Sequence, residues 1–223
     1  MEYHWNFAFV FRHFDKLAWG IALSLQLALI SILIGMVIGL ALALAYTDGG
    51  RTVRAAVSAY VEIIRNVPLL LLIYLVFYGV PSIGGFAYGP ETSFVITLSA
   101  YAGAQMVEVF RAGFDAVSKG INDAGKAIGL TPWQRLVHVR LPTVFRIVLP
   151  SLSNAYISLF KDTSLASVIA VPELMHGAQW INFNSFRILE VYAVVTPMYL
   201  VTGWIILGAL RRLERRVVIQ RRA

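Results

Sequence analysis

The sequence predicts an all-α membrane protein with five transmembrane helices. Of its 223 residues, 58% are hydrophobic and only 14% are charged, whereas a soluble domain of this length needs much more polar surface. Long apolar runs recur along the chain, and a helix needs about 20 mainly apolar residues to cross the hydrocarbon core of a bilayer. The predicted spans lie at about residues 19–45, 57–80, 93–112, 143–160 and 188–210.

The first run, residues 19–45, is too long for a cleaved signal peptide, whose apolar core usually has about 7–15 residues. It therefore predicts a retained helix. Gly35, Gly39 and Ala43 follow one another at four-residue spacing, which gives this helix a narrow face for close packing.

The next two runs carry their own packing signals. Pro68 lies inside the run at residues 57–80 and predicts a kink or break, because proline cannot donate a helical hydrogen bond. The run at residues 93–112 contains the small-residue segment SAYAGA, which favours tight packing against another helix.

Lysine and arginine placement sets the expected orientation. Six arginines lie in the last thirteen residues, RRLERRVVIQRRA, so residues 213–223 are expected to form a basic cytoplasmic tail at the lipid headgroups. Five spans then place residues 1–18 outside as an extracytoplasmic N-terminal segment. The basic residues that fall on the outer side or within the later spans are Arg12, Lys16, Lys161 and Arg187.

The net charge of +7 does not indicate a nucleic-acid partner, because no groove-reading element accompanies it. The chain has no cysteine, which excludes disulfides and thiolate chemistry. It also lacks a G-x-x-x-x-G-K phosphate loop, an H-E-x-x-H motif and a nucleophile–base set. No catalytic residue, metal site or cofactor is expected in this chain.

A polar insert at about residues 113–142 interrupts the apolar pattern and is expected on the cytoplasmic side. Gly129 is a natural helix stop. Thr131 as cap, with Pro132 in the first turn and Gln134 completing a capping box, predicts a second helix. The insert is therefore a helical hairpin.

The hairpin has two interpretations from these features alone. It is either an ordinary amphipathic element at the membrane interface or a docking element for a cytoplasmic partner. Ile121, Ala124 and Ile128 share one face of its first helix. In the docking interpretation, the small residues Ala124, Gly125 and Gly129 let a partner's groove close around the backbone.

The insert resembles the EAA loop of ABC importer permeases, whose pattern is Glu-Ala-Ala, three residues, Gly, nine residues and Ile-x-Leu-Pro. This chain has Asp123-Ala124-Gly125, Gly129 and Val139-Arg140-Leu141-Pro142 at the same spacing. It departs from the pattern by Asp for Glu, Gly for the second Ala and Val for Ile. The residues that the resemblance assigns to ATPase coupling are Asp123, Ala124, Gly125, Gly129, Leu130, Leu141 and Pro142.

Three longer blocks resemble the polar amino-acid permeases of that superfamily: AYVEIIRNVPLLLLIYLVFYGVP, EVFRAGFDAVSKGINDAGKAIGLTPWQRLVHVRLP and FKDTSLASVIAVPEL. The resemblance implies a type I importer with a permease domain over residues 19–212 in the inner membrane. It further implies a second permease subunit, identical or paralogous, an ABC ATPase dimer that binds ATP and Mg²⁺ and contacts the coupling helices, and an external binding protein that delivers a polar amino acid.

Polar side chains inside the apolar spans are candidates for the substrate pathway, because burying them in a bilayer is costly. The apolar segment SLASVIAV is too short to span and is expected to fold back as a half-helix. In this hypothesis Asp162 favours the substrate's ammonium group, and Thr163 and Ser164 favour its carboxylate. The alternative is a structural Lys161–Asp162 ion pair with Thr163 and Ser164 capping the next helix.

Other candidates come from neighbouring spans. Those that could line the pathway are Asn154, Ser158, Tyr74 and Gln105, although packing or interface anchoring is an open alternative for the tyrosine and the glutamine. Two supporting ion pairs are expected at i, i+3 spacing, Glu62–Arg65 and Glu108–Arg111.

Substrate charge and the rival functions follow from the same residues. Asp162 is the sole acidic residue expected in the pathway, so neutral or acidic amino acids are favoured over cationic ones. The alternative functions are a stand-alone channel or ion-coupled carrier, and a membrane anchor for a cytoplasmic enzyme.

Overall fold

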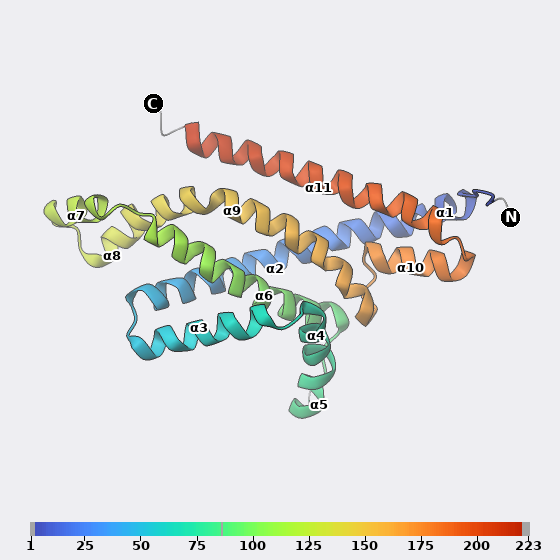
Figure 1. Ribbon diagram of the computed structural model, residues 1–223, viewed down its shortest axis with the longest axis horizontal. Helices are drawn as coiled ribbons and strands as arrows, with labels where there is room; N and C mark the ends of the chain where they lie inside the picture. Colours follow the sequence, from blue (N-terminus) through green and yellow to red (C-terminus); the bar gives the residue numbers. More distant parts are fainter. Residues whose placement is uncertain (1–2, 86, 220–223) are drawn as a thin grey trace.

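The computed structural model describes residues 3–85 and 87–219, and within these ranges its regular structure is helical. The helices form an elongated bundle (Figure 1) in which α7, α8 and the end of α11 lie at one end and α1 and α10 at the other. The α-helices are α1 (Ala8–Arg12), α2 (Phe14–Asp48), α3 (Arg51–Asn66), α4 (Leu69–Tyr74), α5 (Val80–Gly84), α6 (Pro90–Asp115), α7 (Lys119–Ala127), α8 (Pro132–Arg135), α9 (Leu141–Asp162), α10 (Leu174–Ser185) and α11 (Ile188–Ile219). Two π-helical segments, Leu75–Gly79 and Leu136–Arg140, and a 3₁₀ helix, Thr163–Ile169, complete the regular structure.

Four stretches of the described chain are long and apolar enough to cross a membrane: Phe14–Asp48, Pro90–Asp115, Pro132–Ile169 and Ile188–Arg215. They contain the predicted first, third, fourth and fifth spans. The predicted second span is not a straight helix. It consists of α3 and the segment Leu69–Gly84, which meet at an angle of 103°, and it adds a fifth crossing only if this bent pair counts as one.

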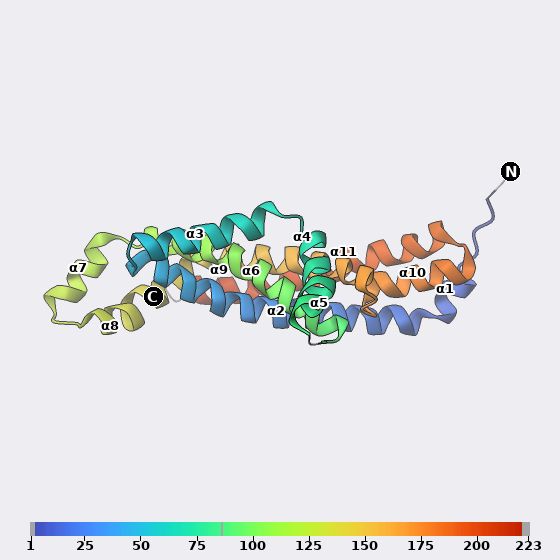
Figure 2. The same cartoon turned by 90° about the horizontal axis from the view of Figure 1, so that it is seen from below.

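The bend follows from Pro68, as predicted. Proline forces the residue before it out of the helical region, and Val67 is extended with φ −95° and ψ 132°. The chain leaves α3 there and turns away, so that α4 and α5 project sideways from the long axis of the bundle (Figures 1 and 2).

The centre of the bundle is the crossing of α2 with α6. The predicted face of α2 is buried there, because Gly35, Gly39 and Ala43 all point inward. A Cβ added at Gly35 would lie 2.6 Å from the Cβ of Ala102, and one at Gly39 would overlap Met106. The two backbones therefore approach more closely than any larger side chain allows.

The remaining helices build outward from this crossing. On α6, Gly113 leaves no room for a Cβ beside Val148, so α9 packs closely there. On the N-terminal half of α2, a Cβ at Gly20 would lie 2.8 Å from the backbone of Leu174, which brings in α10. α11 packs over α9 and α10 and leaves much of its own surface exposed.

Residues 161–187 hold structure that the sequence pattern did not predict. The segment SLASVIAV forms part of a 3₁₀ helix that ends at Ala170, whose φ is 60°, instead of a half-helix of α type. α10 follows it and packs against α2. At the other end of the chain, α11 continues through Ile219, so the described part of the predicted basic tail is helical. Arg221 and Arg222 lie outside the described residues.

We predict that Gly39→Leu destabilises the protein, because the added side chain must push α2 and α6 apart at their closest contact. Overpacking of this kind typically costs about 1–3 kcal/mol. The measurement is the apparent melting temperature of the purified, detergent-solubilised chain. Gly208→Leu is the matched control, since a Cβ at Gly208 meets nothing within 4 Å. Equal melting temperatures for the two variants would contradict the close crossing.

Candidate functional site

The polar insert forms the predicted helical hairpin at one end of the bundle, where α7 leads into α8 (Figure 2). α7 ends in a Schellman motif, in which the NH of Leu130 donates to the carbonyl of Gly125 at 3.0 Å. The NH of Gly129 donates to the carbonyl of Lys126 at 2.9 Å. Gly129 has φ 80°, in the left-handed region that glycine adopts without a steric penalty. The predicted helix stop is confirmed.

The start of α8 is also as predicted. Thr131 Oγ1 accepts a hydrogen bond from the Gln134 NH at 3.3 Å, and Gln134 Oε1 accepts one from the Thr131 NH at 2.9 Å. Pro132 lies in the first turn, where its missing NH would have no helical partner anyway. The capping box of the sequence analysis is therefore present in full.

Pro142 shapes the junction between α8 and α9. Its nitrogen cannot donate to the carbonyl four residues earlier, on His138. The backbone widens into the π-helical segment just before this point, and α9 resumes at Leu141. Leu141 is half-buried against the core between α6 and α9, and Pro142 is exposed.

Gly125 is buried inside the hairpin. A Cβ at this position would lie 3.2 Å from Cδ of Arg135, and Arg135 Nη1 donates to the carbonyl of Leu130 at 2.8 Å. The expectation that Gly125 offers its backbone to a partner's groove is wrong, because the missing side chain makes room for Arg135 instead. Ala124 and Gly129 remain exposed.

The outer surface of the hairpin presents apolar side chains. Ile128 is 76% exposed, Trp133 is 70% exposed and Ile121 is 40% exposed. Between them on α7, Lys126 Nζ lies 2.8 Å from Asp123 Oδ1, and this contact lowers the pKa of the Asp123 carboxyl. The surface thus combines bulky apolar groups with an exposed ion pair.

Arg140 connects the hairpin to the ends of α2 and α6. Its Nη1 lies 3.6 Å from Asp48 Oδ1, and its guanidinium carbon lies 5.1 Å from the ring centroid of Phe114. A pocket of about 400 Å³ beside this contact is lined by residues of α2, α7, α8 and the π-helical segment, among them Asn122 and Trp133. The hairpin and the end of α2 therefore share one surface.

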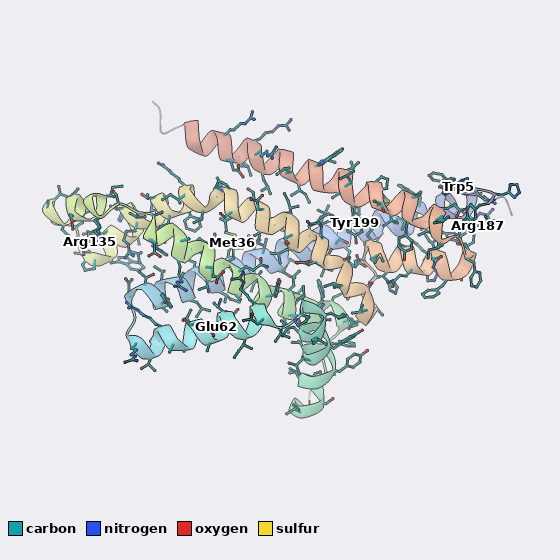
Figure 3. The ribbon with its side chains drawn as sticks, viewed as in Figure 1. Trp5, Met36, Glu62, Arg135, Arg187 and Tyr199 are labelled. Carbon is teal, nitrogen blue, oxygen red and sulfur yellow. The ribbon has the colours of Figure 1, made fainter. Side chains whose placement is uncertain are left out.

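The two predicted ion pairs at i, i+3 spacing do not form. Arg65 pairs with Glu108 instead, which joins the end of α3 to α6, and Glu62 is exposed on α3 (Figure 3). The guanidinium carbon of Arg111 lies 3.6 Å from the ring centroid of Tyr46 on α2. Because the helices pack side by side, partners on a neighbouring helix replace those on the same helix.

A polar stripe runs along the open face of α9. Ser151, Asn154, Ser158 and Lys161 recur at three- or four-residue spacing, which places them on one side of the helix. Ser158 is half-buried and the other three residues are exposed. The opposite side of α9 packs into the cores formed with α2 and α6. In the described chain this side of α9 stays open, with α6 beside Ser151 and α11 beside Lys161.

Helix α6 borders this face. A pocket of about 320 Å³ between α6 and α9 includes Ser151 in its lining. The contact of Gly113 with Val148 sets the register of the two antiparallel helices. About two turns further on, that register places Gln105 of α6 at the depth of Asn154 of α9. Gln105 is half-buried, so the structure brings these two predicted pathway residues to one level.

The residues after the stripe differ in what they expose. Asp162 and Ser164 are half-buried, and the carbonyl of Ser164 accepts a hydrogen bond from the Ser167 hydroxyl at 2.8 Å. Thr163 is fully buried, and its hydroxyl donates to the carbonyl of Phe160 at 2.6 Å. The expectation that Thr163 faces the substrate is therefore corrected, because its hydroxyl is already bonded inside the core.

The alternative ion pair between Lys161 and Asp162 is also absent. Among the side chains described at residues 3–85 and 87–215, the ion pairs are Arg65–Glu108, Lys126–Asp123, Arg140–Asp48 and Arg187–Glu190. Adjacent residues on a helix point about 100° apart, which explains why these two side chains separate.

Tyr74 is 38% exposed on α4, with its ring centroid 5.9 Å from that of Tyr78. α4 packs against α6 and the 3₁₀ helix. Tyr74 therefore lies on a helix that packs beside the 3₁₀ helix, and not along the stripe.

A buried carboxylate that the sequence analysis missed joins three helices. Glu173 is fully buried at the start of α10, where it accepts hydrogen bonds from the NH groups of Met175 at 2.9 Å and His176 at 2.8 Å. It also accepts from the hydroxyls of Ser24 on α2 at 3.3 Å and Tyr199 on α11 at 3.2 Å. The only signal for this cap in the sequence is a glutamate directly before an apolar run. The other partners of Glu173, Ser24 and Tyr199, lie far away in sequence.

The arrangement suits the binding of a polar molecule. Within the described ranges, no group of three His, Cys, Asp or Glu residues could hold a metal ion. The stripe offers hydroxyls, an amide and one ammonium group. These groups hold a polar molecule by hydrogen bonds and charge.

Comparison with known proteins identifies the family of this chain. Residues 31–219 match the family model of the binding-protein-dependent transport system inner membrane component. The glutamine transport system permease protein GlnP of Escherichia coli (strain K12) is 32% identical over 220 residues, 98% of this chain and 100% of GlnP. The L-cystine transport system permease protein TcyB of Bacillus subtilis (strain 168) is 39% identical over 207 residues, 92% of this chain and 86% of TcyB.

A solved structure agrees in fold over the same length. The crystal structure of an amino acid ABC transporter with histidines contains a chain that is 28% identical, with a TM-score of 0.87 over 96% of this chain and 100% of that one. The match includes the hairpin and α9. This protein belongs to the binding-protein-dependent transport system inner membrane components, as the permease of an amino-acid ABC importer.

Proposed function

We propose that the chain forms half of an amino-acid pathway, with the stripe on α9 facing the route and a second permease subunit, identical or paralogous, completing it. The observation that carries this proposal is the exposure of Ser151, Asn154 and Lys161 on one side of a mainly apolar helix. In lipid, unsatisfied polar groups are costly, so such residues face a bundle interior or a water-filled cavity. The single chain provides only one wall for such a cavity.

The hairpin is the proposed contact with the ATPase dimer, whose ATP and Mg²⁺ supply the energy for transport. Its support is the exposed apolar surface of Ile121, Ile128 and Trp133, together with the link from Arg140 to Asp48. In this assignment Asp123, Ala124, Gly129 and Leu130 shape the docking surface. Gly125 and Leu141 hold its geometry from inside, and Pro142 shapes its junction with α9.

The proposed orientation places the hairpin and the C-terminus in the cytoplasm and the N-terminus outside. The hairpin and the end of α11 lie at the same end of the bundle, and α1 lies at the opposite end (Figure 1). Arg211, Arg212 and Arg215 are exposed at the cytoplasmic end, as the positive-inside rule requires. The external binding protein then meets the end that carries α1 and α10.

The proposed substrates are polar amino acids, with neutral or acidic ones favoured. Asp162 is half-buried at the end of α9 and could attract the substrate's ammonium group. A cationic side chain would need a further carboxylate in the same low-dielectric route. A stand-alone carrier or an enzyme anchor has no support from the family, whose members are binding-protein-dependent transport components.

We expect thiol labelling to separate the aqueous route from the lipid-facing surface. The chain has no cysteine, so Asn154→Cys and Ile205→Cys each introduce one thiol into it. Both native residues are exposed in the single chain, but only Asn154 lies on the stripe. A membrane-impermeant thiol reagent applied to the assembled importer should modify Asn154→Cys and leave Ile205→Cys unreacted. The reverse pattern would place the route elsewhere.

Ile128→Asp should uncouple the importer without preventing membrane insertion, because it introduces a charge into the exposed apolar surface of the hairpin. We expect co-purification of the ATPase subunits to fall about 10-fold or more, as for loss of a buried interface residue, and uptake to fall with it. Ile128→Val is the control and should retain both co-purification of the ATPase subunits and amino-acid uptake. Normal ATPase recovery with Ile128→Asp would remove this surface from the interface.

Substrate charge can be tested in the reconstituted importer with radiolabelled glutamine, glutamate and arginine. Uptake of the first two should exceed that of arginine, and Asp162→Asn should lower uptake of all transported amino acids while the ATPase subunits stay bound. Asp162→Glu should retain more uptake than Asp162→Asn. Strong arginine uptake by a homodimeric importer, unchanged by Asp162→Asn, would contradict both the charge preference and the role of Asp162.

A further inference from the structure

The segment before α2 carries a row of aromatic rings on one side. Residues 3–7 read Tyr-His-Trp-Asn-Phe, an alternation that turns the aromatic side chains of an extended chain to the same side. The ring centroids of Tyr3 and Trp5 are 5.3 Å apart, and those of Trp5 and Phe7 are 5.8 Å apart. Phe11 on α1 continues the series at 6.3 Å from Phe7. These four rings form one surface, the aromatic row.

Most of the aromatic row is uncovered. Tyr3 is 49% exposed, Trp5 is 58% exposed and Phe11 is 62% exposed, while Phe7 is half-buried. Contiguous apolar groups that stay uncovered mark a surface for another protein or for a membrane. The row therefore needs a partner other than the described residues.

The segment that carries the row is fixed to the start of α11. Glu190, fully buried in the first turn of α11, accepts hydrogen bonds from the Tyr3 hydroxyl and, at 3.0 Å, from the Asn6 NH. Arg187 Nη1 donates to the carbonyl of His4 at 2.9 Å and to Glu190 Oε1 at 3.3 Å. These bonds hold the segment in place while its rings remain exposed.

The row lies where the apolar spans begin. It is bonded to the first turn of α11, at the start of the apolar run 188–210, and Phe11 precedes the start of the first predicted span by eight residues. Figure 3 shows Trp5 near Arg187 at the end of the bundle that carries α1. Tryptophan and tyrosine gather at this level in membrane proteins, because their rings suit the boundary between acyl chains and headgroups.

The helix that follows has an uncovered apolar side. Trp19 is 74% exposed, and Ile30, Leu33 and Val37 are exposed as well. At 100° per residue, these three side chains lie within about 40° of Trp19 around α2. This side of α2 suits lipid, and it begins at the level of the aromatic row.

Basic groups accompany the aromatic ones. Arg12 directly follows Phe11, is exposed, and takes part in none of the four ion pairs among the described side chains. Lys16 Nζ lies 4.3 Å from the ring centroid of Trp180. Long basic side chains near the ends of spans extend towards the headgroups. The charge of this region thus complements lipid phosphates.

We propose that residues 3–12 form an interfacial anchor, which lies in the headgroup layer with its aromatic row against the lipid. In the proposed orientation this is the outer leaflet. The bilayer is the partner, Arg12 meets its phosphates, and Glu190 couples the anchor to the first turn of α11. The inference depends on insertion of the spans and is independent of the substrate and its route.

The lack of native cysteines allows one thiol of this chain to carry a nitroxide spin label. Trp5→Cys and Phe11→Cys place the label in the aromatic row. His4→Cys is the matched control, because His4 is also exposed but belongs to the polar side of the same segment. The full importer is reconstituted into phosphatidylcholine–phosphatidylglycerol vesicles, with and without the binding protein, and importer with the native chain gives the background from thiols in other subunits.

Power saturation in electron paramagnetic resonance compares collisions of the label with oxygen, which concentrates in the bilayer, and with a water-soluble nickel chelate. We expect the ratio of oxygen to nickel collisions to shift towards oxygen at Trp5→Cys and Phe11→Cys, and towards nickel at His4→Cys. Glu190→Gln keeps the shape of the side chain but weakens its charge-assisted hydrogen bonds. Added to Trp5→Cys, it should increase both the mobility of the label and its collisions with nickel.

Two results would overturn the anchor. Labels in the row that collide with nickel as often as the label at His4→Cys would place the segment in water. Labels that neither reagent reaches would show a protein covering the row: the binding protein if this protection requires its presence, and the second permease subunit otherwise. Unchanged mobility with Glu190→Gln would overturn the coupling to α11.

Discussion

The close approach of α2 to α6 is the constraint on which the other helices depend. Gly35 and Gly39 let two backbones meet without side chains between them, and lipid offers no hydrophobic force that could hold a looser pair together. Once this pair is fixed, α9 can pack on α6 at Gly113, and α10 can pack on α2 at Gly20. Each layer is positioned by a missing side chain, so dispersion contacts between close surfaces carry the fold.

The polar groups of the chain include some that are buried in the fold and others that are exposed along α9. Glu173 and Thr163 are buried and bonded within the fold, Glu173 by four donors and Thr163 by the carbonyl of Phe160, whereas the buried hydroxyls of Ser31, Ser93 and Ser99 have no partner among the described residues. Those along α9, from Ser151 to Lys161, face outward instead. The buried Glu173 carboxylate is thus satisfied within the chain. The polar groups along α9 have no such partners, and a molecule from outside can reach them. The chain belongs to the binding-protein-dependent transport components, as the permease of an amino-acid ABC importer.

Local patterns in the sequence were enough to predict the local structure. The stop at Gly129, the capping box of Thr131 and Gln134, and the bend at Pro68 each depend on a few neighbouring residues. What escaped prediction depends on partners far away in sequence. Arg65 finds Glu108 across a helix interface, and α10 is held by contacts to α2 and α11. For the candidate site, Asn154 and Ser158 indicated part of the polar face of α9 from the sequence. Whether another helix covers that face depends on tertiary packing, which local sequence patterns do not determine.

The segment Pro132–Ile169 runs without a break from the hairpin past Lys161. At about 1.5 Å per residue its 38 residues form a rod of roughly 57 Å, held near its middle by the contact between Gly113 and Val148. A rod fixed at such a point acts as a lever: when one end tilts, the other swings the opposite way. In the proposed assembly, closure of the ATPase dimer on the hairpin would tilt this segment about Gly113, so that the distant end opens in the same movement.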